Sequence, residues 1–312
     1  LLSSEGGAFC WSNMKKNNLQ WGLYIIPALL VYTVFMAFPL LDSLRLSLFT
    51  GNTPQTRSFV GFGNFVRLFT DKTISVRYWG AFKNTWVFFA IHMVVQNGLG
   101  ILFAVLLTQK DMKGRHTYQT IIFIPTTFAV LITGYLWKLI LNPVWSGDFF
   151  TSIGLGFLSY PYLGDTKTAL VTVSLVSCWQ WLGIPTMMFV AALRNISEDL
   201  LEACALEGAS KWQTFRHVKL PLIKPVVGII AVLTFVNNFN AFDIVFAMEN
   251  VNGAPEYSTD LIGTLFYRYG IAGQHPVGIP DIGLGAAIAT ITFFLLLVVV
   301  VPTLTKTQQG GY

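Results

Sequence analysis

Charged residues are scarce in this chain of 312 residues: Asp, Glu, Lys and Arg make up only 11% of it, whereas 54% of the residues are hydrophobic. The mean hydropathy is +0.59. A typical soluble domain carries about 25% charged residues, so this composition excludes an ordinary soluble domain. We therefore expect an all-α, polytopic membrane protein.

The chain is also poor in cysteine, with Cys10, Cys178 and Cys204 only. Their number is odd, their spacing shows no pairing, and two of them lie in or beside long apolar stretches. This pattern supports neither a disulfide framework nor a metal site. We interpret the three cysteines as small apolar side chains that fill space.

The sequence motifs of nucleotide-binding and catalytic sites are missing. No G-x-x-x-x-G-K-[ST] phosphate loop occurs, so the chain is not expected to hydrolyse a nucleotide by itself. Neither H-E-x-x-H nor G-x-S-x-G is present, and the four histidines, His92, His116, His217 and His275, are scattered. We therefore predict no catalytic residues and a protein that is not an enzyme.

Long apolar stretches dominate what remains. Six of them meet or approach the length of about 20 residues that a helix needs to cross a bilayer. They are residues 22–42, 84–108, 119–141, 168–193, 222–248 and 282–303. Residues 1–21 lack a signal-peptide cleavage pattern and are expected to be a cytoplasmic or interfacial segment of the mature protein, with 305–312 as a tail.

Basic residues fall mainly on one set of loops between these stretches. The richer set contains Lys15, Lys16, Lys110, Lys113, Arg115, Arg194, Lys211, Arg216, Lys219, Lys224 and Lys306. The poorer set contains Arg57, Arg67, Lys72, Arg77, Lys167 and Arg268. The positive-inside rule makes the richer set cytoplasmic, and both termini with it. This bias accounts for the net charge of +5, so no nucleic-acid partner is needed.

One cytoplasmic loop, residues 197–221, has the signals of a helix–turn–helix. Ser197 is a good N-cap for a first helix, and Gly208 can end it in the left-handed conformation. Ser210 and Gln213 have the spacing of a capping box for a second helix, which we expect Pro221 to end. This shape would suit the docking of another protein.

The same loop resembles the EAA loop of binding-protein-dependent ABC importer permeases, whose pattern is E-A-A, three residues, G, nine residues, I-x-L-P. The matching residues here are Glu202-Ala203-Cys204, Gly208 and Val218-Lys219-Leu220-Pro221. Cysteine replaces the second alanine and valine replaces the isoleucine.

Further segments are similar to the carbohydrate branch of that family, and to its first, maltose-type permease subunit. They are Phe59-Val60-Gly61-Phe62-Gly63-Asn64-Phe65, Ile124-Pro125, Trp137 with Asn142-Pro143, Trp179-Gln180-Trp181-Leu182-Gly183-Ile184-Pro185, and Asn252-Gly253-Ala254-Pro255. The resemblance implies a type I importer permease fold over residues 22–304 in the bacterial inner membrane.

The resemblance also implies partners. They are a second permease subunit, two cytoplasmic ATPase subunits that bind the ATP and magnesium, a periplasmic or extracellular solute-binding protein, and membrane lipid. The loop would dock into the ATPase, with Glu202 as the charged contact and Gly208 allowing its two helices to cross closely. The implied coupling residues are Glu202, Ala203, Cys204, Glu207, Gly208, Trp212, Phe215, Leu220 and Pro221.

Polar residues inside the apolar stretches are costly in lipid and tend to face a cavity or another helix. The fifth stretch has the densest set, and Thr234 and Asn238 share one helical face. The resemblance implies that these two contact sugar, as do Gly183 and Thr186; Asn240 and the ring of Trp181 complete the predicted path. Simple hydrogen bonding between neighbouring helices is the alternative for each polar residue.

Two functional hypotheses stay open at this stage. The first is half of the translocation path of an ATP-driven importer; the second is a self-contained, ion-coupled secondary transporter, which would tend to show internal repeats and broken helices. The cargo implied for the first is a sugar, either a neutral oligosaccharide like a maltodextrin or an acidic one such as an alginate oligosaccharide, and close relatives also carry glycerol phosphate esters.

Overall fold

The computed structural model describes residues 24–53, 55–110, 112–273 and 278–309, with side chains up to residue 305. The predicted N-terminal segment 1–21, Cys10 and the end of the predicted tail lie outside the described residues. Within the described part the regular elements are helices and one short hairpin, in which Phe49 pairs with Phe59 and Thr50 with Ser58 in antiparallel register. The predicted all-α fold class is confirmed.

The bounds of the elements follow the chain. They are η1 (Thr33–Ala37), α2 (Phe38–Leu46), β1 (Phe49–Thr50), β2 (Ser58–Phe59), α3 (Gly63–Thr70), α4 (Lys72–Ile91), η2 (His92–Gln96), α5 (Asn97–Leu107), α6 (Arg115–Phe123), η3 (Ile124–Thr127), α7 (Val130–Ile140), α8 (Pro143–Ser152), η4 (Gly156–Ser159), α9 (Ala169–Trp181), α10 (Gly183–Arg194), α11 (Glu198–Leu206), α12 (Lys211–Thr214), η5 (Phe215–Lys219), α13 (Leu220–Phe239), α14 (Asp243–Glu249), α15 (Ile262–Tyr267), η6 (Arg268–Ala272) and α16 (Ile282–Gln309).

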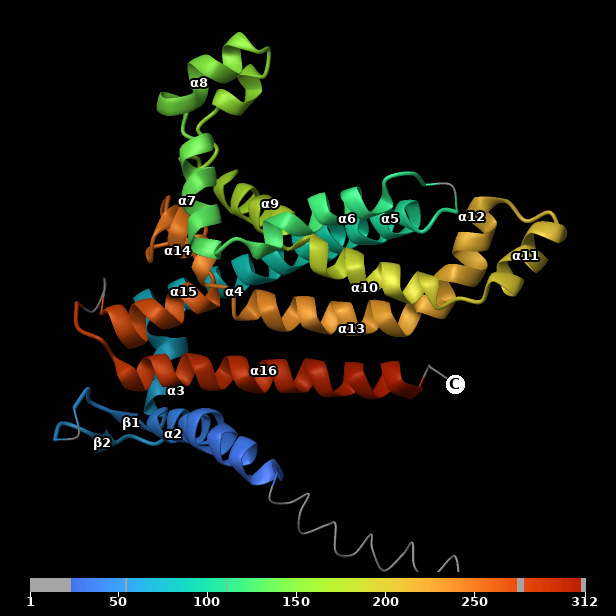
Figure 1. The fold of residues 1–312 in the computed structure, drawn as a ribbon. Helices are drawn as coiled ribbons and strands as arrows, with labels where there is room; N and C mark the ends of the chain where they lie inside the picture. Colours follow the sequence, from blue (N-terminus) through green and yellow to red (C-terminus); the bar gives the residue numbers. More distant parts are fainter. Residues whose placement is uncertain (1–23, 54, 111, 274–277, 310–312) are drawn as a thin grey trace, which may run out of the picture.

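The long helices run side by side as a bundle, with α13 packed against α16, α10 and α4, and α10 packed against α5 (Figure 1). The helices α11 and α12 project from one end, and α14, α15 and the β-hairpin lie at the other. We call the end that carries α11 and α12, which form a helical hairpin, the hairpin end. The opposite end, with α14, α15 and the β-strands, is the α15 end. The C-terminal part of α16 points toward the hairpin end.

The lengths and apolar composition of the helices agree with the predicted spans. Among the described residues, four helices are long and apolar enough to cross a membrane unbroken, namely Tyr24–Leu46, Lys72–Leu107, Lys211–Phe239 and Ile282–Thr305. Two bent pairs, Arg115–Thr127 with Val130–Ile140 and Ala169–Trp181 with Gly183–Arg194, raise the number to six if each pair is one span.

The predicted third and fourth spans, 119–141 and 168–193, are not straight helices as their apolar runs suggested. The third bends by 97° after η3, where Phe128 and Ala129 are extended. The freed carbonyl of Phe128 accepts a hydrogen bond of 3.1 Å from Nε2 of Gln180 on α9. A neighbouring helix thus satisfies the backbone at the break, as irregular structure inside a membrane requires.

The fourth span bends by 47° between α9 and α10. Pro185 has no N–H to give to the carbonyl of Trp181 four residues earlier, which weakens the helix at this point. Nε2 of Gln96, on the second span, donates to that carbonyl at 3.3 Å. The bend is therefore a consequence of one proline, and a side chain from another helix supports it.

The predicted fifth span, 222–248, ends early. The helix stops at Phe239, and after a non-helical step at Phe242 the separate helix α14 begins. The side chain of Asn240 donates to the carbonyl of Val236 at 2.9 Å. The start of α15 packs closely against the break, since a Cβ on Gly263 would lie 2.3 Å from the carbonyl oxygen of Ala241. A hydrophobicity pattern cannot show such a break, because both sides of it are apolar.

The bundle buries apolar side chains where helices meet and leaves others outside. One core cluster joins α5, α10 and α13 around Phe189, Leu193 and Ile223. By contrast, the first helix, Tyr24–Leu46, buries none of its most apolar window. A helix that is apolar on all sides yet unburied is typical of a lipid-facing span.

Candidate functional site

The described chain forms a half-open cavity of about 310 Å³ beside the breaks in the fourth and fifth spans. This volume lies in the range of small-molecule sites. Its lining residues come from the second to the fifth spans and α14. They are Phe88, His92, Gln96, Val130, Ser177, Trp181, Ile184, Pro185, Met188, Ile230, Leu233, Thr234, Asn237, Asn238, Asn240, Ala241, Phe242, Asp243 and Ile244.

Some polar groups of this cavity are already used to join helices. His92 is buried, with Nδ1 at 2.8 Å from the carbonyl of Phe88 and Nε2 at 3.0 Å from Oγ of Ser177 on α9. Oγ1 of Thr234 donates to Ile230 O at 2.8 Å and accepts from Nδ2 of Asn97 at 3.1 Å. Hydrogen bonding between helices is therefore at least part of the role of His92 and Thr234.

Other polar groups of the cavity are available. Within the described residues, the side chains of Asn237, Asn238 and Asp243 form no hydrogen bond or ion pair. Asn237 and Asn238 lie in the last turn of α13, and Asp243 is the first residue of α14. Because the helix breaks between them, amides and a carboxylate from two elements line one space.

The structure brings together most of the residues that were predicted to form a path. Trp181, Thr234, Asn238 and Asn240 all line the cavity. Gly183 and Thr186 do not: both are buried in the bundle, and Oγ1 of Thr186 donates to Leu182 O at 2.8 Å. Whether any of these residues contacts a substrate stays a prediction.

Gly183 has a packing role instead. A Cβ at this position would lie 2.9 Å from the Cα of Phe123 and 3.0 Å from the carbonyl oxygen of Ile122. The glycine thus lets the start of α10 approach the backbone of α6 closely.

Sequence reasoning missed Ser177 and Phe242 as cavity residues. Ser177 lies within α9, and its Oγ is 3.0 Å from Nε2 of His92 on the second span. Phe242 is placed by the break in the fifth span, where its ring stacks on Phe246 at a centroid distance of 5.1 Å and packs against Tyr267 at 4.7 Å. The signal that could have found Phe242 was the polar run Asn237-Asn238 and Asn240 at the end of an apolar stretch, which marks the end of a helix.

The second candidate site is the α11–α12 hairpin, residues 197–221, whose predicted caps are present. Oγ of Ser197 accepts a hydrogen bond of 3.2 Å from the N–H of Leu200. Ser210 and Gln213 form both bonds of the capping box, at 3.3 and 2.8 Å. Gly208 has a φ of +81°, as predicted for a left-handed helix end.

The turn of the hairpin is a Schellman motif. The N–H of Ala209 donates to Cys204 O at 3.0 Å, and the N–H of Gly208 donates to Ala205 O at 3.1 Å. The prediction that Gly208 allows a close crossing of the two helices is wrong, because a Cβ there would meet nothing within 4 Å. Glycine is needed here for its backbone conformation, not for space.

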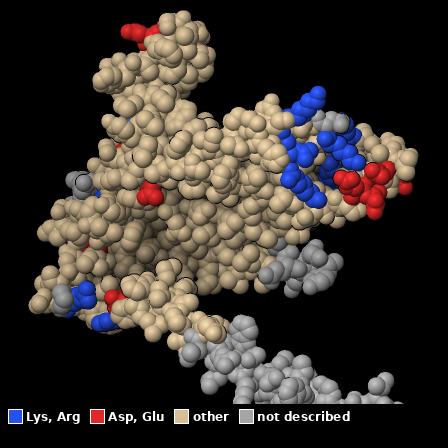
Figure 2. All heavy atoms as spheres, viewed as in Figure 1, with Lys and Arg blue, Asp and Glu red and all other residues tan. Residues whose placement is uncertain are grey.

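Apolar side chains and charges both lie open at the hairpin. Leu206 is 90% and Trp212 is 64% exposed, and the rings of Trp212 and Phe215 pack with centroids 5.6 Å apart. Figure 2 shows basic and acidic side chains gathered side by side at this end of the molecule. Ala203, Glu207 and Pro221 are also exposed, while Cys204, Phe215 and Leu220 are partly buried.

Glu202 has a partner within the chain. Nζ of Lys110, in the loop between the second and third spans, lies 3.3 Å from Oε1 of Glu202 and 3.8 Å from Oε2 of Glu198. The hydrogen bond to Glu202 and the charges of both acids raise the pKa of Lys110. Both partners in each pair are exposed, so the contacts are weak and readily exchanged.

Pro221 does not end the second helix, so this prediction is wrong. The helix continues from Lys211 through η5 into α13 and ends at Phe239, a length of 29 residues. Pro221 sits in the first turn of α13, next to the π-helical turn η5, where the register of the backbone hydrogen bonds changes and a missing N–H is tolerated. One helix therefore joins the α11–α12 hairpin to the cavity.

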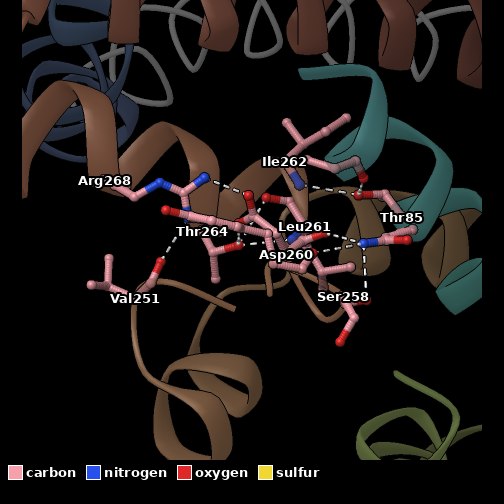
Figure 3. Close-up of polar contacts among 11 residues, drawn as sticks. Thr85, Val251, Ser258, Asp260, Leu261, Ile262, Thr264 and Arg268 are labelled. Atoms are coloured by element: carbon pink, nitrogen blue, oxygen red, sulfur yellow. Dashed lines mark hydrogen bonds and ion pairs between the residues drawn. The ribbon is translucent and has the colours of Figure 1, made fainter. Parts of the chain in front are cut away.

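The α15 end holds a buried polar network that the sequence did not reveal. Arg268 and Asp260 form a bidentate ion pair, and both side chains are almost fully buried (Figure 3). Nη1 of Arg268 also donates to Val251 O at 3.0 Å, and Oγ1 of Thr264 donates to Asp260 at 2.6 Å. Sequence alone placed Arg268 among the loop cations.

The second span anchors the same segment. Nδ2 of Asn84 donates to the carbonyls of Ser258 and Asp260 at 3.0 and 3.1 Å, and Oγ1 of Thr85 accepts from the N–H of Ile262 at 3.1 Å. The residues 250–261 between α14 and α15 are thus fixed to the bundle (Figure 3). This anchoring holds α14, and with it one wall of the cavity.

The described residues contain no group of three His, Cys, Asp or Glu side chains that could hold a metal ion. Their two cysteines, Cys178 and Cys204, are free thiols.

A bundle of candidate spans around a cavity that holds amide, hydroxyl and carboxylate groups, joined by one long helix to a projecting hairpin, is compatible with a membrane transport protein. The chain belongs to the family described as binding-protein-dependent transport system inner membrane component, which matches residues 96–308. This membership confirms the predicted family and its type I importer permease fold.

Named relatives and a solved structure agree with this assignment. The chain is 28% identical over 262 residues to the lactose transport system permease protein of Rhizobium radiobacter, covering 82% of this chain and 85% of that protein. It is 29% identical over 290 residues to the trehalose/maltose transport system permease protein of Thermococcus litoralis, covering 92% and 93%. A chain of a bacterial ABC transporter involved in alginate import has the same fold, with a TM-score of 0.78, 21% identity, and coverage of 96% of this chain and 98% of that one.

The family assignment decides between the two functional hypotheses. Members are the membrane components of transport systems that depend on a separate binding protein. The alternative of a self-contained, ion-coupled secondary transporter is therefore wrong, although the structure does contain the broken helices that were taken as a sign of that class.

Proposed function

We propose that this chain is one of two permease subunits of an ABC importer and forms half of the path by which a saccharide crosses the bacterial inner membrane. The observation that carries the proposal is the uninterrupted helix Lys211–Phe239. One of its ends belongs to the α11–α12 hairpin, and the other carries Asn237 and Asn238 on the cavity wall. At 1.5 Å per residue this helix is about 43 Å long, enough to link a partner on one face of a bilayer to a site within it.

The hairpin end lies in the cytoplasm in this proposal. Lys110, Lys113, Arg115 and the basic residues of 194–224 gather there, which is the distribution that the positive-inside rule associates with the cytoplasmic face. The C-terminal part of α16 points to the same side, and the N-terminus is proposed to share it.

The α11–α12 hairpin docks into a cytoplasmic ATPase subunit. Exposed Leu206 and Trp212 provide apolar contact area, while the caps at Ser197 and Ser210 and the Gly208 turn keep the two helices preformed. Glu202 exchanges its exposed bond to Lys110 for a cation of the ATPase. Two such ATPase subunits bind ATP and magnesium, a second permease completes the path, and an external solute-binding protein delivers the cargo.

The chain itself contributes no catalytic group in this proposal. The cavity polar groups are mainly amides and hydroxyls next to the ring of Trp181, a combination suited to hydrogen bonding and stacking with a sugar. The names of the curated relatives, which include lactose, trehalose/maltose and arabinooligosaccharide systems, support a saccharide as cargo.

Charge exchange at Glu202 tests the docking. In the reconstituted complex, we expect Glu202→Lys to uncouple ATP hydrolysis from uptake and from stimulation by the binding protein, while membrane insertion is retained. The double variant Lys110→Glu with Glu202→Lys restores the pair within the chain but not the contact with the ATPase, so it should stay uncoupled. Glu256→Lys, an exposed charge reversal at the α15 end, is the matched control.

Either of two results would contradict the proposal. Wild-type coupling in Glu202→Lys would remove Glu202 from the docking surface. Restored coupling in the double variant would show that Glu202 acts only through Lys110.

A further inference from the structure

Within the described residues, the cavity wall carries an acidic side chain, that of Asp243, but no Lys or Arg side chain. His92 is the other ionisable lining residue, and both nitrogens of its ring are engaged with Phe88 and Ser177. The half-path that this chain forms therefore presents negative charge and neutral polar groups.

The carboxylate of Asp243 is not neutralised by the elements around it. It forms no ion pair within the described residues. Two cations near the α15 end have other partners: Arg268 pairs with Asp260, and the guanidinium of Arg77 lies 3.4 Å from the centroid of the Tyr257 ring. Lys83, on α4, forms no ion pair with Asp243 or with any other described residue. Lys138, on α7, interacts electrostatically with Glu249 at the far end of α14.

The position of Asp243 is fixed rather than incidental. It is the first residue of α14, and the neighbouring residues Ile244, Val245 and Met248 are buried in a core cluster. The anchored segment 250–261 holds the other end of this helix. The carboxylate is thus held at the cavity wall beside the free amides of Asn237 and Asn238.

We propose that Asp243 sets the charge selectivity of this half-path, so that it accepts uncharged saccharides and repels those that carry carboxylate or phosphate groups. A carboxylate can accept hydrogen bonds from two hydroxyls of a sugar ring, and the amides can both donate and accept. Toward an anion the same carboxylate, which is exposed on the cavity wall, is repulsive. The inference rests on the proposed function, and it selects neutral cargo over an oligomer of uronic acids or a phosphate ester.

Thiol-reagent kinetics test the selectivity without knowledge of the cargo. In the complete transporter, with Cys10, Cys178 and Cys204 of this chain replaced by serine or alanine, Asn237→Cys places a thiol on the cavity wall. The experiment measures the ratio of the reaction rate with the cationic trimethylammonium-ethyl methanethiosulfonate to the rate with the anionic sulfonato-ethyl reagent. We expect this cation-to-anion ratio to be about ten times larger at Asn237→Cys than at a small free thiol. Asp243→Asn should remove most of this excess, and Asp243→Lys should reverse it.

Two controls make the result decisive. The neutral methyl methanethiosulfonate should label Asn237→Cys equally with and without Asp243→Asn, which shows that access is unchanged. At Val144→Cys, exposed on α8 and outside the cavity lining, Asp243→Asn should leave the cation-to-anion ratio unaltered.

The inference fails if the ratio at Asn237→Cys does not depend on residue 243, or if the neutral reagent fails to reach that thiol. Either result would leave the docking of the hairpin to an ATPase untouched, because that proposal is tested by coupling. Conversely, a transporter that stays coupled after Glu202→Lys would remove Glu202 from the docking surface even if the cavity proves cation-selective.

Discussion

The two ends of the bundle hold their connecting segments in different ways. At the α15 end, the segment 250–261 is anchored by the buried pair of Arg268 and Asp260 and by hydrogen bonds from Asn84. At the hairpin end, α11 is attached through the exposed contacts of Lys110 with Glu198 and Glu202. Buried pairs are costly to break, whereas exposed pairs contribute little and exchange easily.

This difference indicates a division of roles. The α15 end is a fixed support that keeps α14 against the cavity. The hairpin is rigid within itself, through its caps and the Schellman turn, but is only weakly attached to the neighbouring loop. A docking element has to be preformed yet free to change partners, and the contacts at the two ends fit that distinction.

Breaking the buried network should have the largest effect. Arg268→Ala leaves the carboxylate of Asp260 buried and unpaired, and we expect a loss of about 3–5 kcal/mol in the free energy of unfolding. Thermal unfolding of the detergent-solubilised transporter would measure it. Replacing both partners, Arg268→Met with Asp260→Leu, should recover a large part of the loss; a double variant no more stable than Arg268→Ala would show that the ion pair is not the source.

Changing the turn of the hairpin should abolish coupling without unfolding the bundle. Gly208→Val forces a β-branched residue to a φ of +81°, whereas Gly208→Asn tolerates that conformation. Because a side chain at this position meets no neighbour, only the backbone distinguishes the two variants. We expect ATPase stimulation by the binding protein to be lost in the valine variant and largely kept in the asparagine variant. Equal loss in both would show that the docking surface itself excludes a side chain.

A substitution in the cavity should change transport without the loss of stability or of coupling that is expected from substitutions at the two ends. Asn238→Ala removes a free amide, and a lost hydrogen bond of about 1.4 kcal/mol corresponds to a tenfold change in transport of the cargo. Stimulation of ATP hydrolysis by the binding protein should survive. Uptake that equals the wild type would remove this face of α13 from the path.

The smallest effect is expected from the exposed pair at the hairpin end. Lys110→Ala should lower thermal stability by no more than about 1 °C and change transport less than twofold, since exposed ion pairs contribute little. A loss of stability comparable with that of Arg268→Ala would contradict the contrast between the two ends.

The sequence predicted the repeating features of the structure well. Six apolar runs indicated the six candidate spans, and local cap residues such as Ser197, Gly208 and Ser210 predicted the ends of α11 and the start of α12. These features depend on composition and on contacts a few residues apart, which a single sequence contains.

The breaks in the spans could not be predicted in the same way. The sequence contains Pro125 and Pro185, but whether a proline bends a span depends on side chains from other helices that satisfy the freed backbone carbonyls. Here Gln180 and Gln96 donate those hydrogen bonds. Pro221, in contrast, was expected to stop a helix and did not, because it falls in the first turn of α13 beside a π-helical turn. The pairing of Arg268 with Asp260 likewise depends on the fold of a loop.

The free amides and carboxylate on the cavity wall also bear on assembly. If the second permease of the proposed complex covers this wall, Asn237, Asn238 and Asp243 face an enclosed space, whereas without that partner they would face lipid acyl chains. Exposing a carboxylate and two amides to hydrocarbon costs several kcal/mol. We therefore expect this chain, when it is synthesised in excess of its partner, to have a shorter lifetime in the membrane than the assembled subunit.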